Sequence, residues 1–163
     1  MKNIKISLGN DHFGFPMKAA VLEILNDLGC KVIDHGCYST DPVDFPDIAR
    51  KVCNSVRSGE AERGIMICGT GIGASIAANK IPGIRAATVH DVHCAHQGVE
   101  HDDLNILTMG AQIIGAWLAK DIIKAYVEAE FSTDEAFRRR VSKLHVLELD
   151  AAKELQKEIE QNG

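Results

Sequence analysis

Positive charge is scarce in this 163-residue chain, and its scarcity excludes several classes of protein. The 18 Lys and Arg residues are outnumbered by 23 Asp and Glu, for a formal net charge of −5, so the chain has no basic footprint for nucleic acid. Long apolar runs are missing too: none reaches the roughly 18 residues of a membrane helix, and residues 1–10 lack a signal-peptide core. We therefore expect a cytoplasmic protein without a membrane or nucleic-acid partner.

Paired cysteines are also absent. The five cysteines form an odd set with no C-x-x-C motif, which argues against a disulfide framework and against a structural zinc site. What the chain does have is an ordinary globular composition, 45% hydrophobic and 25% charged. At this length we expect one domain, residues 1–163, with a single substantial core.

Short apolar runs alternate with helical patterns along the chain. Residues 4–9, 31–35, 63–68, 84–89 and 105–109 are typical of strands. A helical pattern follows each of them, and the one after the fourth strand is polar. This alternation predicts an α/β fold, with a five-stranded parallel sheet, right-handed crossovers and helices on both faces. In such sheets ligands bind outside the carboxyl ends of the strands.

A long helix is predicted for about residues 132–163. Ser132 and Glu135 have the spacing of a capping box at its start. Its apolar stripe is long enough to extend past a compact body, so we expect this helix to pack on a partner subunit. The stripe consists of Phe137, Val141, Leu144, Leu147, Ala151, Leu155 and Ile159.

The chain is organised around the stretch that begins at Arg63. Its apolar residues stop at Cys68, three glycines follow within five positions, and helix-forming residues begin at Ala74. Glycines at this strand-to-helix turn let several N–H groups point at one anion. Because these amides and the helix dipole favour a thiolate, we expect the pKa of Cys68 to be lowered. The glycines are Gly69, Gly71 and Gly73.

Three interpretations of this loop stay open on spacing alone. The glycines match the G-x-G-x-x-A fingerprint of dinucleotide sites, with Asp91 following about 20 residues on. Alternatively the loop is an oxyanion or enediolate hole, with Cys68 as base or nucleophile. The third interpretation is a plain turn beside an inert buried cysteine. A Walker phosphate loop is excluded, because no Gly-Lys-Ser/Thr sequence follows.

Polar residues follow several of the predicted strands. Asp11 and His12 follow the first, Cys68 ends the third, and His90 and Asp91 follow the fourth. Because parallel strands end at one edge of a sheet, these residues are expected to converge there. This convergence favours a chemical role for the loop over a plain turn.

Three histidines after the fourth strand, His90, His93 and His96, have Cys94 among them. Three residues advance a helix by about 300°, so these side chains drift around the helix instead of converging, and no metal site is predicted. We expect a solvated polar face that tunes the nearby pocket electrostatically.

Four motifs occur together in this chain. They are Gly9-Asn10-Asp11-His12-x-Gly14, Asp44-Phe45-Pro46, Ile67-Cys68-Gly69-Thr70-Gly71-Ile72-Gly73 and Glu100-His101-Asp102. Over roughly residues 3–145 the chain thereby resembles the family of ribose-5-phosphate isomerase type B and galactose-6-phosphate isomerase. The resemblance implies a Rossmann-like three-layer α/β/α sandwich that uses neither a nucleotide cofactor nor a metal. It also implies aldose–ketose isomerisation of a sugar phosphate in sites shared between subunits of a homodimer or homotetramer.

The resemblance further implies roles for individual residues. Cys68 would be the base that moves a proton between C1 and C2, and Thr70 would shuttle protons between the two oxygens. Asp11 and His101 would open the sugar ring, and His12 resembles a phosphate contact. The amides that would hold the cis-enediolate belong to Gly69, Thr70, Gly71, Ile72, Gly73 and Ala74.

Several positions depart from the family pattern. Phe45 stands where tyrosine is usual, Gln112 where many members have arginine, and Asp102 where asparagine is usual. Of the arginines near the carboxyl end only Arg140 matches, and Arg138 or Arg139 is a candidate to replace the lost one. Fewer guanidinium groups weaken phosphate recognition.

The expected substrate is ribose 5-phosphate with ribulose 5-phosphate, or a related pentose or hexose phosphate. The alternatives are another, possibly unphosphorylated, sugar, and a non-catalytic subunit of a mixed assembly. The presence of Asp11, Cys68, Thr70 and His101 argues against the non-catalytic subunit. A nucleotide-dependent enzyme is the third class, which protection by NAD against thermal unfolding would reveal.

Overall fold

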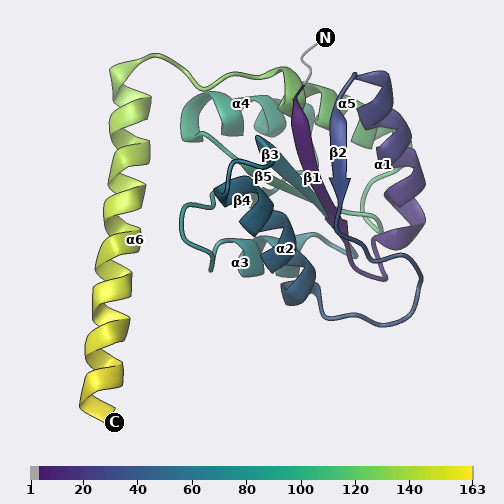
Figure 1. Cartoon of the computed structure of the whole chain (residues 1–163). Coiled ribbons are helices and arrows are strands. Elements are labelled where there is room, and N and C mark those ends of the chain that lie inside the picture. The colour runs from purple at the N-terminus through teal and green to yellow at the C-terminus, as the bar shows by residue number, and fades with distance from the viewer. Residues whose placement is uncertain (1–3, 163) are drawn as a thin grey trace.

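Strands and helices alternate along residues 4–162, the part of the chain that the computed structural model describes (Figure 1). The strands are β1 (Lys5–Asn10), β2 (Lys31–Asp34), β3 (Arg63–Cys68), β4 (Ala86–Thr88) and β5 (Ile106–Gly110). The helices are α1 (Phe15–Asp27), α2 (Phe45–Arg57), α3 (Ile72–Ala78), α4 (Val92–Asp102), α5 (Ala116–Glu128) and α6 (Glu135–Asn162). Within these residues, no helix is both long enough and apolar enough to cross a membrane.

The five strands form one parallel sheet in the order β2-β1-β3-β5-β4, as the alternating pattern predicted. β3 lies at its centre, between β1 and β5. Helices cover both faces there, so Ile65, Met66 and Ile67 are all fully buried although they are consecutive. An uninterrupted apolar run is therefore the natural sequence for this strand.

Two hydrophobic cores separate the layers. α1, α4 and α5 pack on one face of the sheet, where Val21, Val99 and Ile122 contribute to the larger core. α2 and α3 pack on the other face, with Val52 and Ala74 in the smaller core. Figure 1 shows these helices on the two sides of the sheet, which confirms the Rossmann-like three-layer α/β/α sandwich.

The carboxyl ends of the strands meet at one edge of the sheet. Asn10 of β1 is paired with Ile67 of β3, and Cys68 of β3 is paired with Gly110 of β5. The fourth strand joins this edge through His90, whose Nε2 accepts a hydrogen bond of 2.9 Å from the Gly110 N–H. The ends of these strands, and His90 after β4, therefore lie at the same end of the sheet, as expected from the sequence.

The C-terminal helix α6 stands beside the sandwich, and its C-terminal end extends beyond the rest of the molecule in Figure 1. Its predicted capping box is wrong, because Asp134 caps the helix instead: its Oδ1 accepts 2.7 Å from the Ala136 N–H and its carbonyl accepts from Arg138. Asp is one of the preferred N-cap residues, and Asp134 directly precedes the first residue of α6. Apolar side chains of α6 such as Leu147 (65%) and Ile159 (68%) are exposed. Packing of α6 on a partner subunit stays a prediction.

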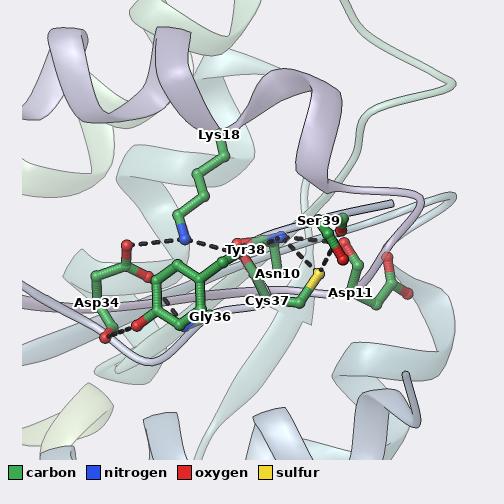
Figure 2. Close-up of polar contacts among 8 residues, drawn as sticks. All are labelled: Asn10, Asp11, Lys18, Asp34, Gly36, Cys37, Tyr38 and Ser39. Carbon is green, nitrogen blue, oxygen red and sulfur yellow. Dashed lines mark hydrogen bonds and ion pairs between the residues drawn. The ribbon is translucent and has the colours of Figure 1, made fainter. Parts of the chain in front are cut away.

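A buried polar network supports the end of β1 (Figure 2). Asn10 donates through Nδ2 to the carbonyls of Asp11 (3.0 Å) and Cys37 (3.3 Å), which ties β1 to the loop after β2. The same Cys37 carbonyl accepts 2.9 Å from the ammonium of Lys18, and Lys18 pairs with Asp34 at 2.8 Å. Lys18 also lies over the Tyr38 ring, 4.1 Å from its centroid. A single buried ammonium from α1 thus joins three segments behind the strand ends.

Replacing Lys18 by Met is expected to lower the free energy of unfolding by about 2–4 kcal/mol, because it leaves the Asp34 carboxylate and the Cys37 carbonyl without their cation. Urea unfolding monitored by circular dichroism measures the loss. Lys153→Met is the matched control: Lys153 pairs with Asp150 at 3.2 Å on the exposed surface of α6. Exposed pairs contribute under about 1 kcal/mol, so an equal loss in both variants would contradict the role given to Lys18.

Candidate active site

A thiol and a carboxylate are in direct contact at the carboxyl edge of the sheet. The Cys68 Sγ lies 2.8 Å from Oδ2 of Asp11, to which the thiol donates. The other carboxylate oxygen accepts 2.8 Å from the N–H of Gly14, which starts the turn into α1. Asp11 (3% exposed) and Cys68 (9%) are both buried, so their interaction is weakly screened by water.

The expected lowering of the Cys68 pKa is wrong, because burial and the neighbouring carboxylate outweigh the loop amides. Desolvation is the largest influence and raises the pKa of the thiol, and the hydrogen bond and negative charge of Asp11 raise it further. Hydrogen bonds from the backbone of Gly71 and Gly69 lower the pKa, but by less. At rest the site therefore holds a neutral thiol that is hydrogen-bonded to the Asp11 carboxylate.

The glycine loop, residues 69–73, directly follows Cys68 and leads into α3. Gly71 is at φ +82°, in the left-handed region, and caps α3. Thr70 is exposed, and its Oγ1 accepts a hydrogen bond of 3.3 Å from the Ile72 N–H. α3 has only seven residues, so the local N–H groups matter more here than a helix dipole. Ala74 is fully buried and anchors the loop in the smaller core.

Two of the substrate-binding candidates lie against the loop. The ring of Phe45, at the start of α2, packs so close to Gly73 that a Cβ there would lie 3.0 Å from its Cζ. Gln112 donates through its backbone N–H to the Gly69 carbonyl at 3.1 Å, and its side-chain oxygen would lie 3.2 Å from a Cβ at Gly69. An apolar ring and a neutral amide therefore stand beside the loop glycines.

His12 lies beside a groove that leads away from this edge. Its Nδ1 accepts 3.2 Å from the Val43 N–H, so in the neutral ring the proton is on Nε2. The groove has a volume of about 490 Å³ and is lined by residues that include His12, Phe13 and Gln112, with no Lys or Arg among them. The described residues of this chain place no strong cation in the groove.

Three predicted site residues lie elsewhere in the subunit. His101 and Asp102 end α4, shortly before β5 begins at Ile106, which pairs with Gly64 rather than with Cys68. The four residue steps from Gly64 to Cys68 span about 13 Å of strand, so His101 and Asp102 are at the opposite end of the sheet. There His101 stacks on Phe137 of α6, with ring centroids 4.0 Å apart.

Arg140 belongs to the same cluster as His101, because its guanidinium lies 5.5 Å from the centroid of the Phe137 ring. Of the other two arginines, Arg138 lies over the ring of Phe131 and Arg139 pairs with Glu135. All three are on the first turns of α6. The predicted site is thus divided into a thiol part and a His–Arg part that do not meet within one subunit.

The sequence did not indicate several residues that hold the thiol part together. Thr88 and Thr108 donate to the carbonyl of Gly71, and the Asn10 side chain donates through Nδ2 to the carbonyl of Asp11. Two threonines in otherwise apolar strands were the available signal, but strand threonines are common. Only the register, which pairs Thr88 with Thr108, shows that they act on one atom.

A thiol, a carboxylate and convergent backbone N–H groups at the strand ends of an α/β sandwich define a class: enzymes that move protons on a small carbonyl compound. Comparison with known proteins agrees. The family model described as Ribose/Galactose Isomerase matches residues 6–144, and the chain belongs to that family. The resemblance inferred from the four motifs is thereby confirmed.

The match to individual relatives covers most of the length of each relative. The chain is 42% identical to ribose-5-phosphate isomerase B of Escherichia coli over 127 residues, 78% of this chain and 85% of that protein. It is 38% identical over 132 residues to a D-erythrulose-4-phosphate isomerase of Pectobacterium atrosepticum, with the same coverage of 78% and 85%. The structure of Clostridium thermocellum ribose-5-phosphate isomerase B superposes with a TM-score of 0.87 at 43% identity, covering 91% of this chain and 99% of that one.

Asp11→Asn is expected to lower the pKa of Cys68, because it removes two of the influences that raise it, the carboxylate's charge and its acceptance of the thiol proton. The rate of iodoacetamide alkylation of Cys68, followed by peptide mass spectrometry against pH, reports the thiolate fraction. The midpoint should move to lower pH in the variant. Cys53, whose pKa burial raises to about 12, is the internal control and should stay unmodified in both proteins. An unchanged or higher midpoint for Cys68 would contradict this assignment.

Proposed function

We propose that this chain interconverts an aldose phosphate and its ketose through a cis-enediolate, with Cys68 as the base. The contact of 2.8 Å between Cys68 and Asp11, beside the N–H groups of the glycine loop, carries this proposal. An enediolate mechanism needs a base for a carbon-bound proton and donors for the oxygen that gains charge. The raised pKa of Cys68 makes its thiolate a stronger base but leaves little of it at neutral pH, so the thiol must lose its proton as part of this step.

The proton steps balance without any further reagent. Cys68 passes its thiol proton to Asp11, and the thiolate takes the proton from C2 of the open-chain aldose. The electron pair of that bond moves into the C1 carbonyl, giving an enediolate held by loop amides from Gly69 to Ala74. Thr70 transfers a proton between O1 and O2, and Cys68 returns the carbon-bound proton at C1. Asp11 then gives the thiol proton back.

We infer that each complete site takes residues from two copies of the chain. His101, Asp102 and Arg140 lie at the end of the sheet opposite to Cys68, so their predicted roles require a second copy that brings them to the thiol part. His101 of that copy would open the sugar ring with Asp11. A homodimer with two-fold symmetry forms two such sites at once, and a homotetramer forms four. The exposed apolar stripe of α6 supports such an association.

The substrate class we infer is a phosphorylated sugar of four to six carbons. Relatives are named for ribose 5-phosphate, D-erythrulose 4-phosphate and galactose 6-phosphate, which share the phosphate but differ in length. The groove at His12 has no Lys or Arg of its own, so Arg140 of the second copy, with Arg138 or Arg139, would supply the guanidinium groups that a phosphate needs. Phe45 and Gln112, whose side chains lie beside Gly73 and Gly69, would contact the sugar.

Cys68→Ala is expected to lower kcat for the preferred phosphosugar by about 10²- to 10⁴-fold, the usual contribution of a general base. An isomerisation assay on ribose 5-phosphate, allose 6-phosphate, galactose 6-phosphate and their unphosphorylated sugars measures this loss. Cys94→Ala, at an exposed cysteine, is the matched control and should keep full activity. No turnover of any phosphosugar by the wild-type protein would sink the proposal and favour an unphosphorylated substrate or a non-catalytic subunit.

A mixture of two inactive variants tests whether the sites are shared. Cys68→Ala and His101→Ala should each be inactive alone, because every site then lacks one group. After the two are unfolded together and refolded, random pairing in dimers should restore roughly a quarter of wild-type activity, since a hybrid dimer has one site with both groups intact. Activity that stays at the level of the separate variants would show that His101 acts within its own subunit or not at all.

A further inference from the structure

The carbonyl oxygen of Gly71 accepts hydrogen bonds from two side-chain hydroxyls, in addition to the Ser75 N–H of α3, which donates to it at 3.0 Å. Oγ1 of Thr88 lies 3.1 Å from it, Oγ1 of Thr108 lies 3.0 Å from it, and the two hydroxyls are 3.0 Å apart. Thr88 on β4 is paired in register with Thr108 on β5, so both side chains are on the same face of the sheet. Thr108 is fully buried, and Thr88 is half-buried.

Packing alone does not account for these hydroxyls. Valine has nearly the same shape, suits a strand equally well and has no polar group to desolvate. The pair has two protons for the acceptors around it: the Gly71 carbonyl, and the Ala87 carbonyl at 3.3 Å from Thr108. Only one of these acceptors, Gly71, belongs to the glycine loop. The hydroxyl pair therefore links the sheet to the loop at a single carbonyl.

Fixing this carbonyl also fixes the N–H of the same peptide. In a trans peptide the C=O and the following N–H point in opposite directions. With the Gly71 carbonyl held by Thr88 and Thr108, the N–H of Ile72 points to the other side, where it donates 3.3 Å to Thr70 Oγ1.

We propose that Thr88 and Thr108 are positioning residues for the isomerase reaction, because they hold the Gly71 carbonyl and thereby fix the Ile72 N–H of the same peptide beside Thr70, in the loop that would hold the enediolate. This role rests on the proposed function. Neither threonine touches the substrate. Donors that are already aimed stabilise the developing charge without reorganising, so the effect falls on kcat rather than on substrate binding.

The Thr88→Val/Thr108→Val double variant tests the proposal, with Thr88→Ser/Thr108→Ser as the matched control that keeps both hydroxyls. We expect the valine variant to lose about 10- to 100-fold in kcat, less than the loss of a donor itself, with KM changed by less than about threefold. Its affinity for a phosphorylated aldonohydroxamate, which mimics the planar enediolate, should fall by a similar factor. Its affinity for the matching sugar alcohol phosphate, which cannot form an enediolate, should not change.

Three results would overturn the positioning role: a kcat of the valine variant within about twofold of wild type, equal losses in the valine and serine variants, or equal losses of affinity for both analogues. If the double valine variant fails to fold, Thr88→Val alone, at the less buried position, is measured in the same way against Thr88→Ser. Failure of the proposed function is distinguishable, because the wild-type protein would then turn over no phosphosugar at all.

Discussion

The contact between Cys68 and Asp11 depends on the adjacency of β1 and β3, and the chemistry of the molecule depends on that contact. The Asp11 N–H donates to the Ile67 carbonyl, so the pairing of the two strands continues one residue beyond β1 and brings the carboxylate to the thiol. Gly14 closes the turn after Asp11 so tightly that a Cβ there would lie 2.1 Å from the Ile67 oxygen. Behind this turn, the Lys18 network fixes Asn10, and the sheet thus determines the distance between acid and base.

The electrostatics of this pair favour proton transfer over nucleophilic attack. Burial and the Asp11 carboxylate raise the pKa of Cys68, so little thiolate exists at rest, and thiolate is the form that reacts with oxidants and alkylating agents. A carbon acid, by contrast, is deprotonated by a base that lies within hydrogen-bond reach of its proton. The same carboxylate that raises the pKa of the thiol is positioned to accept its proton, and the glycine loop is positioned to receive the negative charge that appears on the sugar.

Much of this arrangement could be predicted from the sequence, because apolar periodicity and glycine placement reflect local constraints. Such patterns predicted the five strands, their parallel arrangement in one sheet, and the convergence of Asp11 with Cys68 at the carboxyl ends of the strands. The pKa of Cys68 was predicted in the wrong direction, since the sequence shows the amides of the loop but not the burial of the thiol or its distance from Asp11. Thr88 and Thr108 could not be predicted from the sequence, because their common partner, the Gly71 carbonyl, is apparent only from the register of β4 and β5. Family resemblance suggested His101 and Arg140. The sequence could not show that they lie at the end of the sheet opposite to Cys68, because this depends on how α4 and α6 pack in three dimensions.

The most direct test of base catalysis at Cys68 is the fate of deuterium placed at C2 of the aldose phosphate that the protein turns over. A thiolate that removes this deuteron and returns it at C1 exchanges part of it with water, so deuterium should appear in the solvent during isomerisation, and Cys68→Ala should abolish both exchange and turnover. Complete transfer of the label from C2 to C1, with none in the solvent at any stage of conversion, would indicate a hydride shift and contradict an enediolate held at this site.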